Sequence, residues 1–284
     1  MKTTSNRTSP SFQSNATDRL ANLPWWAIII LLAATFFVYS FITNELYQEV
    51  IKKLVVGIRL TLTVTITAYI FAITIGLLTG LGQLSSNIII RNAALLYVQV
   101  IRGVPIIVQI FYTAFVIVPA AIVAINLLGV RLASTGWMPP DNIFTNLSIR
   151  DVNFIARGII ALALSYGAFS AEIFRAGIQS ISTGQIEAAQ ALGLTRFQSL
   201  KLIILPQAIR RVLPPLGNDF IAMLKESSLV SVLGVNEITH LGKKYAAASF
   251  RFPETYNTLA FLYLSMTLIL SMGVKAMERK FKTD

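Results

Sequence analysis

Residues 154–206 read FIARGIIALALSYGAFSAEIFRAGIQSISTGQIEAAQALGLTRFQSLKLIILP. The apolar run from Phe154 to Phe174 is long enough to cross a bilayer, which takes about 20 predominantly apolar residues. The segment that follows, from Ser182 to Pro206, is too polar for a span and too regular for a disordered linker. This succession indicates an integral membrane protein in which a span opens into a structured loop.

The rest of the chain has the composition of a membrane protein. Of its 284 residues, 55% are hydrophobic and 13% are charged, about half the charged share of a soluble domain. The chain contains no cysteine, so a disulfide framework and a thiolate site are both excluded. The net charge of +11 comes from Lys and Arg residues that stand between apolar runs, as in proteins oriented by the membrane. We therefore expect an all-α integral membrane protein and no nucleic-acid partner.

Hydropathy predicts about six transmembrane helices. The first, 24–42, opens with two tryptophans suited to the membrane interface. In the second, Gly76 and Gly80 stand four residues apart, a spacing that lets another helix approach closely. The expected spans are 24–42, 58–81, 104–125, 154–174, 212–233 and 256–274.

The orientation follows from the positive charges. With six spans both termini lie on one side, and that side holds 14 Lys and Arg residues against 9 on the other, with Lys225 set aside inside a span. Cytoplasmic loops carry the excess of Lys and Arg. We therefore expect a disordered cytoplasmic tail over 1–23, a cytoplasmic tail over 276–284, and a cytoplasmic loop around Glu187.

The loop from Ser182 to Pro206 is expected to form two short helices joined at Gly193. Ser182 with Gln185, and Thr195 with Gln198, have the spacing of capping boxes, and glycine is the usual residue where a helix ends with φ > 0. The first helix has a surface of small residues, and the second places apolar residues along one face. Such a hairpin suits either a partner's groove or the surface of the membrane.

The loop also resembles a known motif. Glu187-Ala188-Ala189, Gly193, Ile203 and Leu205-Pro206 match, at every fixed position, the coupling-loop motif of ABC importer permeases. In that family the loop docks into a cleft of a separate ATPase subunit. The resemblance implies that Glu187 contacts the ATPase, that Ala188 and Ala189 allow a close approach, and that Gly193 makes the bend.

The resemblance extends over residues 57–275 and is closest to the permeases of the polar amino acid uptake family. Four further elements carry it: Gly57-Ile58-Arg59-Leu60-Thr61-Leu62, Ile101-Arg102-Gly103-Val104-Pro105, Gly167-Ala168-Phe169-Ser170-Ala171-Glu172-Ile173-Phe174-Arg175, and Leu224-Lys225-Glu226-Ser227-Ser228-Leu229. Val104 stands where the family usually has Thr. The family usually has five spans, so 24–42 is an additional N-terminal transmembrane helix.

The resemblance implies a type I ABC importer permease fold for 57–275 and a location in the cell inner membrane. The implied partners are ABC ATPase subunits, a second permease subunit (identical or homologous) and an external, or periplasmic, solute-binding protein. The implied substrate is a polar amino acid of the glutamate, glutamine or basic type. No cofactor and no metal are expected.

Ionisable residues inside the expected spans are candidates for the translocation path, because charge at membrane depth is costly and tends to face a wet cavity. Asp219 and Glu226 are seven residues apart and share a helical face, with Lys225 and Ser227 beside them. These four could complement the ammonium and carboxylate of an amino acid; the alternatives are an internal salt bridge or a gate at the helix end. Glu172 and Arg175 are expected to form a structural ion pair.

The sequence lacks the features expected of two other functional classes, an ion-coupled secondary carrier and a membrane enzyme. The chain lacks the G-x-x-x-x-G-K-[ST] phosphate loop, so it is not expected to hydrolyse ATP itself. An ion-coupled secondary carrier would be expected to show repeated halves with broken helices, and no such repeat is visible. A membrane enzyme would need a catalytic constellation, and neither a nucleophile elbow nor a metal-ligand spacing is present.

Overall fold

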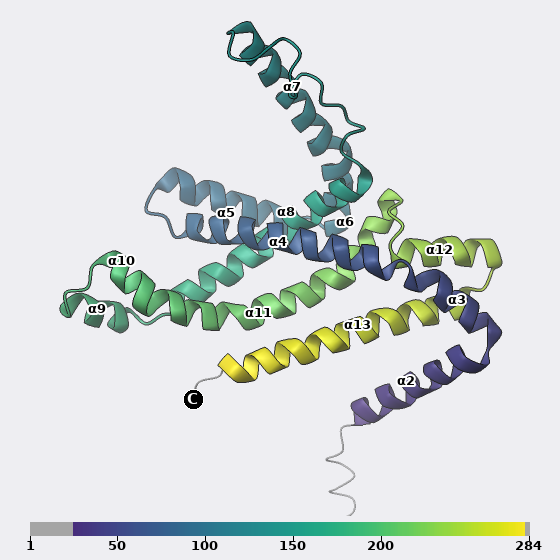
Figure 1. Cartoon of the computed structure of the whole chain (residues 1–284). Helices are drawn as coiled ribbons and strands as arrows, with labels where there is room; N and C mark the ends of the chain where they lie inside the picture. The colour runs from purple at the N-terminus through teal and green to yellow at the C-terminus, as the bar shows by residue number, and fades with distance from the viewer. Residues whose placement is uncertain (1–24, 282–284) are drawn as a thin grey trace, which may run out of the picture. The chain divides into compact units, whose positions relative to one another are not determined.

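The computed structural model describes residues 25–281, except the side chains of Ile186 and Arg196, and it is all-helical over that range. The expected disordered tail 1–23 lies outside the described residues. The chain divides into two compact units, one ending at Glu49 and one beginning at Val50. The expected all-α fold class is confirmed (Figure 1).

The first unit contains α2 (Trp25–Thr43) and the start of α3 (Glu45–Val55). Helix α2 is 19 residues long and apolar enough to cross a membrane. Between the two helices, the side chain of Asn44 accepts a hydrogen bond of 2.9 Å from the backbone N–H of Leu46. The rings of Phe41 and Tyr47 then pack edge to face, with centroids 5.9 Å apart.

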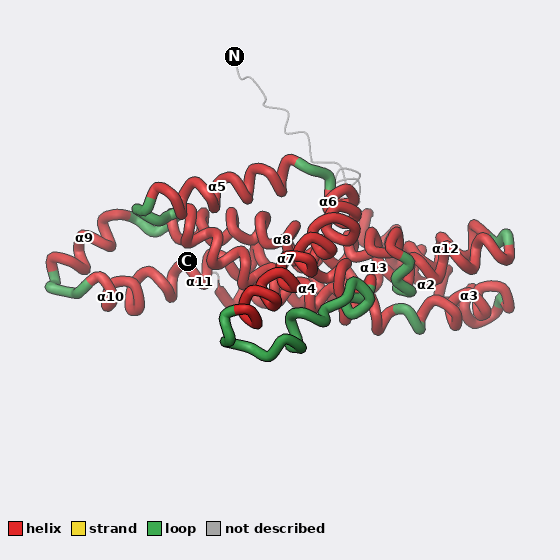
Figure 2. Tube along the Cα trace, turned by 90° about the horizontal axis from the view of Figure 1, so that it is seen from above, coloured by secondary structure: helices red, strands yellow, loops and turns green. Residues whose placement is uncertain are grey.

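The second unit contains the remaining helices, which Figure 2 shows in a second view. Their bounds are α4 (Ile58–Gln83), α5 (Ile88–Gly103), α6 (Ile106–Tyr112), α7 (Val118–Ser134), α8 (Phe154–Gln179), α9 (Thr183–Ala191), α10 (Arg196–Ser199), α11 (Leu205–Glu226), α12 (Ile238–Ser249) and α13 (Phe252–Phe281). Two π-helical turns, Thr113–Ile117 and Leu200–Ile204, and a 3₁₀ helix, Ser227–Leu233, complete the unit.

Five helical segments within 25–281 are long and apolar enough to span a membrane: Trp25–Thr43, Glu45–Gln83, Ile106–Ser134, Phe154–Gln179 and Phe252–Lys280. They correspond to five of the six expected spans. The remaining one, 212–233, is helical, but it is the charged helix α11 continued by a 3₁₀ helix. Helix α5 was not expected from the sequence, because its 16 residues are fewer than a full span requires.

The core of the second unit forms where α4 packs closely along α8. A Cβ at Gly76 would lie 2.6 Å from the Cβ of Ser170, and one at Gly80 would lie 2.9 Å from the carbonyl oxygen of Ala171. Both distances are too short for any larger side chain. The expected small-residue pair is therefore the surface on which α8 approaches.

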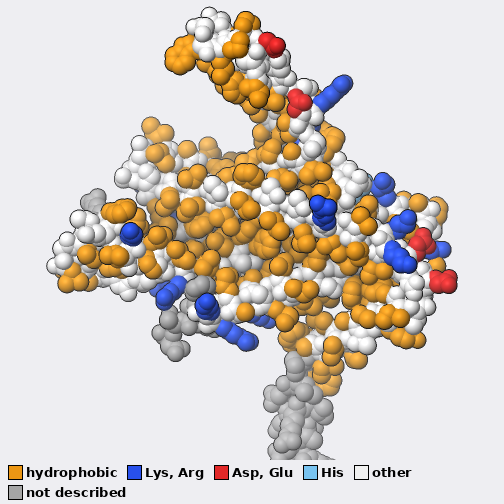
Figure 3. Space-filling view, viewed as in Figure 1, with side chains coloured by type: hydrophobic (Ala, Val, Ile, Leu, Met, Phe, Trp, Pro, Cys, Tyr) orange, Lys and Arg blue, Asp and Glu red, His pale blue; other side chains and the backbone are white. Residues whose placement is uncertain are grey.

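The outer surface of the second unit is largely apolar. In Figure 3 hydrophobic side chains cover the middle of the long helices, and most Lys and Arg side chains gather near their two ends. Exposed residues on α4 include Ile70, Phe71 and Leu78, each more than half exposed. An exposed apolar band bounded by positive charge is the surface expected of a protein surrounded by lipid.

The two π-helical turns have the same cause. Each ends two residues before a proline, Pro119 or Pro206, and a proline ring inside a helix clashes with the preceding turn and lacks an N–H. At the first turn, Val118 N–H donates to the carbonyl of Thr113, five residues back. The next donor in that pattern would be Pro119, so the carbonyl of Ala114 is left without one.

Arg157 supplies the missing donor. Its guanidinium donates to the carbonyls of Ala114 at 3.1 Å, Val152 at 2.8 Å and Ile149 at 2.5 Å, and it lies 4.9 Å from the centre of the Phe154 ring. The side chain is 7% exposed. These contacts tie the start of α8 to the base of α7, which projects away from the other helices of the unit (Figure 1).

Candidate functional site

The candidate site is built by α8 and α11, which run antiparallel. Gly177 on α8 lies so close to Val212 on α11 that an added Cβ would come within 2.1 Å of Val212 Cγ1. Further along, Gly158 lies against Val230 in the same way, with an added Cβ 3.0 Å from its Cγ1. Small residues on α8 therefore allow α11 and the 3₁₀ helix after it to pack at short distance.

Two carboxylates of α11 meet hydroxyl groups of α8. The hydroxyl of Ser170 donates to Asp219 Oδ2 at 3.0 Å, and the hydroxyl of Tyr166 donates to Glu226 Oε2 at 3.0 Å. Both hydroxyl-bearing residues are buried, with Ser170 0% and Tyr166 2% exposed. A cavity of about 130 Å³ is lined by Tyr166, Phe169, Asp219, Ala222 and Glu226.

The cavity carries negative charge without a cation to balance it. The ion pairs among the described side chains involve only Glu172, with Arg102 and Arg175. Asp219 and Glu226 receive neutral hydroxyl donors instead, which satisfy some of their oxygen lone pairs but leave the charge in place. Such a cavity can bind a cationic group such as an ammonium.

The structure brings together only two of the four residues expected to line the path. Asp219 and Glu226 line the cavity, but Lys225 is exposed on another face of α11 and forms no internal salt bridge with Glu226. Ser227 is fully buried, and its hydroxyl donates to the carbonyl of Leu224 at 2.7 Å. The role of these four residues in the path remains a prediction.

Sequence reasoning missed the partners on α8, Tyr166 and Ser170. They are four residues apart, so they lie on one face of the helix, and each carries a hydroxyl within an apolar span. That spacing was the feature of the sequence that could have pointed to these two residues. It could not be matched to Asp219 and Glu226, because the sequence does not say which helices are neighbours.

The expected pair of Glu172 and Arg175 is confirmed near the C-terminal end of α8. Arg175 Nη2 lies 2.6 Å from Glu172 Oε2, while Arg102 Nη1 lies 3.9 Å from the same oxygen. A second cavity of about 490 Å³ opens here, lined by Arg102, Glu172, Ile173, Ala176, Gly177, Ser180, Arg211 and Pro215. The guanidinium of Arg211 donates to the carbonyl of Ser180, the residue that follows α8.

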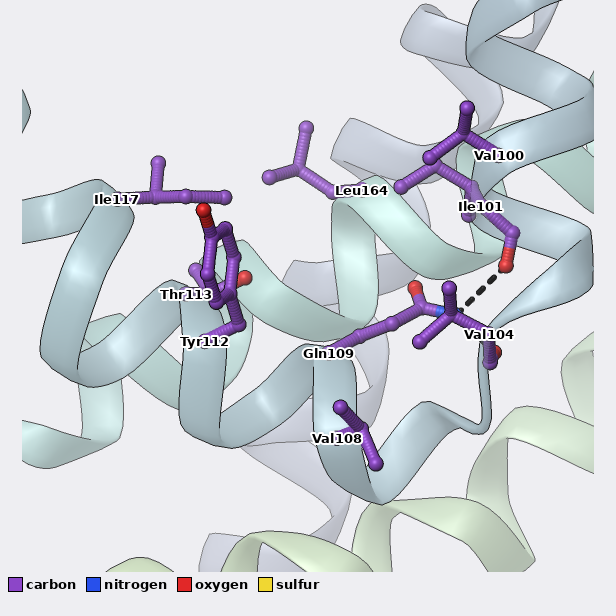
Figure 4. Close-up of a pocket in the computed structure, with 9 residues that line it drawn as sticks. All are labelled: Val100, Ile101, Val104, Val108, Gln109, Tyr112, Thr113, Ile117 and Leu164. Atoms are coloured by element: carbon purple, nitrogen blue, oxygen red, sulfur yellow. Dashed lines mark hydrogen bonds between the residues drawn. The ribbon is translucent and has the colours of Figure 1, made fainter.

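A third cavity lies where the chain breaks between α5 and α6 (Figure 4). Pro105 interrupts the helix, and the side-chain amide of Gln109 donates to the carbonyls of Ile101 and Val104, each at 2.7 Å. Its oxygen accepts a hydrogen bond of 2.6 Å from Ser165. The cavity, about 480 Å³, has mostly apolar walls, so it offers no site for a charged solute.

The loop after α8 forms the expected helical hairpin. Gly193 has φ of +77° and makes the bend between α9 and α10. The second capping box is confirmed: Thr195 N–H donates to Gln198 Oε1 at 2.8 Å, and Gln198 N–H donates to Thr195 Oγ1 at 3.2 Å. The first is wrong, because the side chain of Ser182 makes no cap bond and the side chain of Gln185 accepts from Gln207 instead.

The hairpin exposes apolar side chains at its tip and along its second arm. Leu192 is 80% exposed, Phe197 72% and Leu202 62%, so the described part of the chain does not cover them. Glu187 and Ala188 are exposed beside them, whereas Ala189 is 1% exposed and faces into the hairpin. Leu205 is 48% exposed, and Pro206 follows the second π-helical turn.

Contiguous exposed apolar side chains of this kind mark an interaction surface. In residues 25–281 no group of three or more His, Cys, Asp or Glu side chains is placed to hold a metal ion.

Comparison with known proteins gives consistent matches. Residues 72–283 match the model of the family described as "Binding-protein-dependent transport system inner membrane component". The chain is 34% identical over 232 residues to the glutamine transport system permease protein GlnP of Escherichia coli K12, covering 82% of this chain and 94% of that protein. It is also 34% identical to the probable amino-acid permease protein YxeN of Bacillus subtilis, covering 84% of this chain and 97% of that protein.

Solved structures show the same fold. A chain in the crystal structure of an amino acid ABC transporter with histidines superposes with a TM-score of 0.66 at 33% identity, covering 84% of this chain and 98% of that chain. A chain of the MetNI methionine ABC transporter superposes with a TM-score of 0.58 at 20% identity, covering 81% and 96%. The second similarity concerns the fold alone.

Proposed function

The chain belongs to the family of binding-protein-dependent transport system inner membrane components, and we propose that it is the permease subunit of an ATP-driven importer of polar amino acids. As a member of this family it is the component that resides in the membrane, and ATP is hydrolysed by a separate subunit. The relatives named as glutamine and amino-acid permeases support the substrate class. The domain limits 57–275, with the coupling loop 182–206, are part of the proposal.

The single observation that carries the proposal is the hairpin at the inner end of α8 and α11. It exposes Leu192, Phe197 and Leu202 and, on its first arm, Glu187, the acidic residue of the motif. Because this surface is apolar and the hairpin leads directly into α11, a protein that binds the hairpin can move the helix that bears Asp219 and Glu226. We propose that this protein is the ATPase subunit.

The cavity between α8 and α11 supports an amino acid as the cargo. Its two carboxylates complement an ammonium group, and the neighbouring Tyr166 and Phe169 supply flat apolar walls. The pathway would form between this chain and a second permease subunit, with an external binding protein delivering the solute. In this arrangement both termini and the hairpin face the cytoplasm.

Uptake into vesicles tests the energy source. Uptake that continues with ATP after the ion gradients are collapsed supports the importer. Uptake abolished by an uncoupler alone, with ATP present, refutes it in favour of an ion-coupled secondary carrier.

A pair of variants tests the two parts of the mechanism separately. Glu187→Ala should lower the amount of ATPase that copurifies with the permease while leaving permease abundance unchanged. Glu226→Gln should leave the ATPase bound but reduce the rate of uptake, because the cavity loses one of its two charges. Unchanged substrate affinity and rate in Glu226→Gln would remove Glu226 from the path.

A further inference from the structure

Two of the cavities lie on the same faces of α8 and α11: the one lined by Asp219 and Glu226, called here the outer part, and the one lined by Arg102 and Arg211, called the inner part. Together we refer to them as one groove. Side chains spaced three or four residues apart share a helical face, and both cavities use one such face on each helix. These faces carry Tyr166, Phe169, Ile173 and Ala176 on α8 with Ser180 just after it, and Glu226, Ala222, Asp219, Pro215 and Arg211 on α11. The contacts Tyr166–Glu226, Ser170–Asp219 and Ser180–Arg211 show the two helices aligned antiparallel throughout.

The charge along this groove changes sign. The outer part holds the carboxylates of Asp219 and Glu226. The inner part holds the guanidinium groups of Arg102 and Arg211 together with the carboxylate of Glu172, whose charge Arg175 balances. With a rise of 1.5 Å per residue, the eight residues from Asp219 to Arg211 span about 12 Å. This spacing along the helix exceeds the separation of the α-ammonium and α-carboxylate of one amino acid, so we infer that these two groups engage the two parts in succession.

The two inner guanidinium groups retain donors for a ligand. Glu172 is engaged by Arg175 at 2.6 Å, and Arg102 stands 3.9 Å away, beyond hydrogen-bonding distance. Arg102 also lies 5.7 Å from the centre of the Phe169 ring, which holds it over the groove. Arg211 donates to the carbonyl of Ser180. Since a guanidinium has five N–H donors, both can still bind a carboxylate.

We propose that Arg102 and Arg211 form an inner binding station for the carboxylate of the transported solute, reached after its ammonium has left Asp219 and Glu226. The proposal rests on the proposed function, because it requires a solute that bears both groups. The order of the charges favours inward passage, since the carboxylate is drawn toward the cytoplasmic end. Arg211 is tied to the residue just before the hairpin, so a shift of the hairpin also moves this station.

The test is an equilibrium titration of the permease–ATPase complex in nanodiscs of zwitterionic lipid, without the external binding protein. The two probes are L-glutamine and L-glutaminamide, in which a neutral amide replaces the α-carboxylate. Both keep the ammonium group, so the difference between them reports only on carboxylate recognition. L-Glutamine is the probe because relatives of this chain are named as glutamine permeases, and uptake of L-glutamine in vesicles shows whether it is carried.

The wild-type complex should bind L-glutamine at least about ten-fold more tightly than the amide, the effect of one charge-assisted hydrogen bond. Arg102→Gln and Arg211→Gln should each reduce this preference, and together they should abolish it. The matched control is Arg210→Gln, which removes the same charge from the neighbouring, exposed position of α11 and should keep the preference.

Three results would overturn the inference. The first is a wild type that does not prefer L-glutamine over the amide, and the second is a preference that survives in the double variant. The third is a complex that responds to phosphatidylglycerol in the nanodisc but not to the amino acid. The last result would assign the two arginines to a lipid phosphate. ATP-driven uptake by the same complex, reconstituted in sealed vesicles together with its external binding protein, separates the two failures. Uptake without the carboxylate preference overturns only this inference, whereas absence of uptake overturns the proposed function.

Discussion

The contact between Gly177 and Val212 makes a sharp prediction about the groove. A Cβ at Gly177 would lie 2.1 Å from Val212 Cγ1. Val212 is 5% exposed and β-branched, so its side chain has little freedom to turn aside. Overpacking of this kind costs up to about 3 kcal/mol, and the better helix propensity of alanine recovers about 1 kcal/mol.

Gly177→Ala should therefore lower the free energy of unfolding by about 2 kcal/mol. For a chain of this size that corresponds to a fall of about 4–8 °C in Tm, measured by thermal unfolding of the purified protein in detergent. Val212→Ala alone should cost about 1.6 kcal/mol, because two buried methyl groups are lost. In the double variant the new methyl at residue 177 occupies the space left by Val212 Cγ1.

The double variant consequently should be more stable than the sum of the single changes predicts, by about 2 kcal/mol. Such non-additivity is expected only for residues in contact. The control is Gly273→Ala on α13, where an added Cβ meets nothing within 4 Å, and where Tm should stay constant or rise. Additive costs, or a Gly177→Ala variant as stable as the wild type, would refute the close packing of α8 on α11.

Three further predictions concern single positions. Gly193→Ala places an L-residue at φ of +77°, which costs about 1–2 kcal/mol. Less ATPase should therefore copurify with Gly193→Ala than with Gly193→Asn. Equal amounts of copurified ATPase would contradict the bend at Gly193. Arg157→Lys should lower Tm, because one ammonium group cannot reach the carbonyls of Ala114, Ile149 and Val152 together. An unchanged Tm would show that Arg157 does not anchor the base of α7. Burial raises the pKa of Glu237, so its contribution to stability is fully present below the ordinary pKa of glutamate and is lost as pH rises through the raised value. The Tm of the wild type minus the Tm of Glu237→Gln should accordingly fall with rising pH, and a rise in this difference would contradict the raised pKa.

The hairpin shows what local sequence can predict. Gly193 and the reciprocal bonds of Thr195 and Gln198 were expected because a capping box and a left-handed helix end depend on residues a few positions apart. Ser182 and Gln185 have the same spacing, but Gln185 is drawn to Gln207 on α11 by a bond of 2.6 Å. A tertiary contact thus overrode a local pattern at the first cap and left the second intact.

The transmembrane spans and the groove between α8 and α11 also differ in how far the local sequence predicts them. Long apolar runs identify α2, α4, α8 and α13, because burial in lipid requires a continuous apolar surface that composition reveals. The sixth expected span, 212–233, differs, because α11 carries charged residues and is not among the segments apolar enough to cross a membrane. Its carboxylates face hydroxyl groups of α8, and this protein environment, which hydropathy cannot detect, accounts for a charged helix between apolar ones.

The sequence by itself therefore determined the membrane environment, the approximate spans and the bent hairpin, because each depends on residues that are close along the chain. The pairing of α8 with α11 was decided only by the tertiary structure, through the fit of Gly177 against Val212. That pairing placed Tyr166 beside Glu226 and Ser170 beside Asp219. Contacts between residues some fifty or sixty positions apart depend on which helix faces can approach, and helical periodicity alone does not specify that choice.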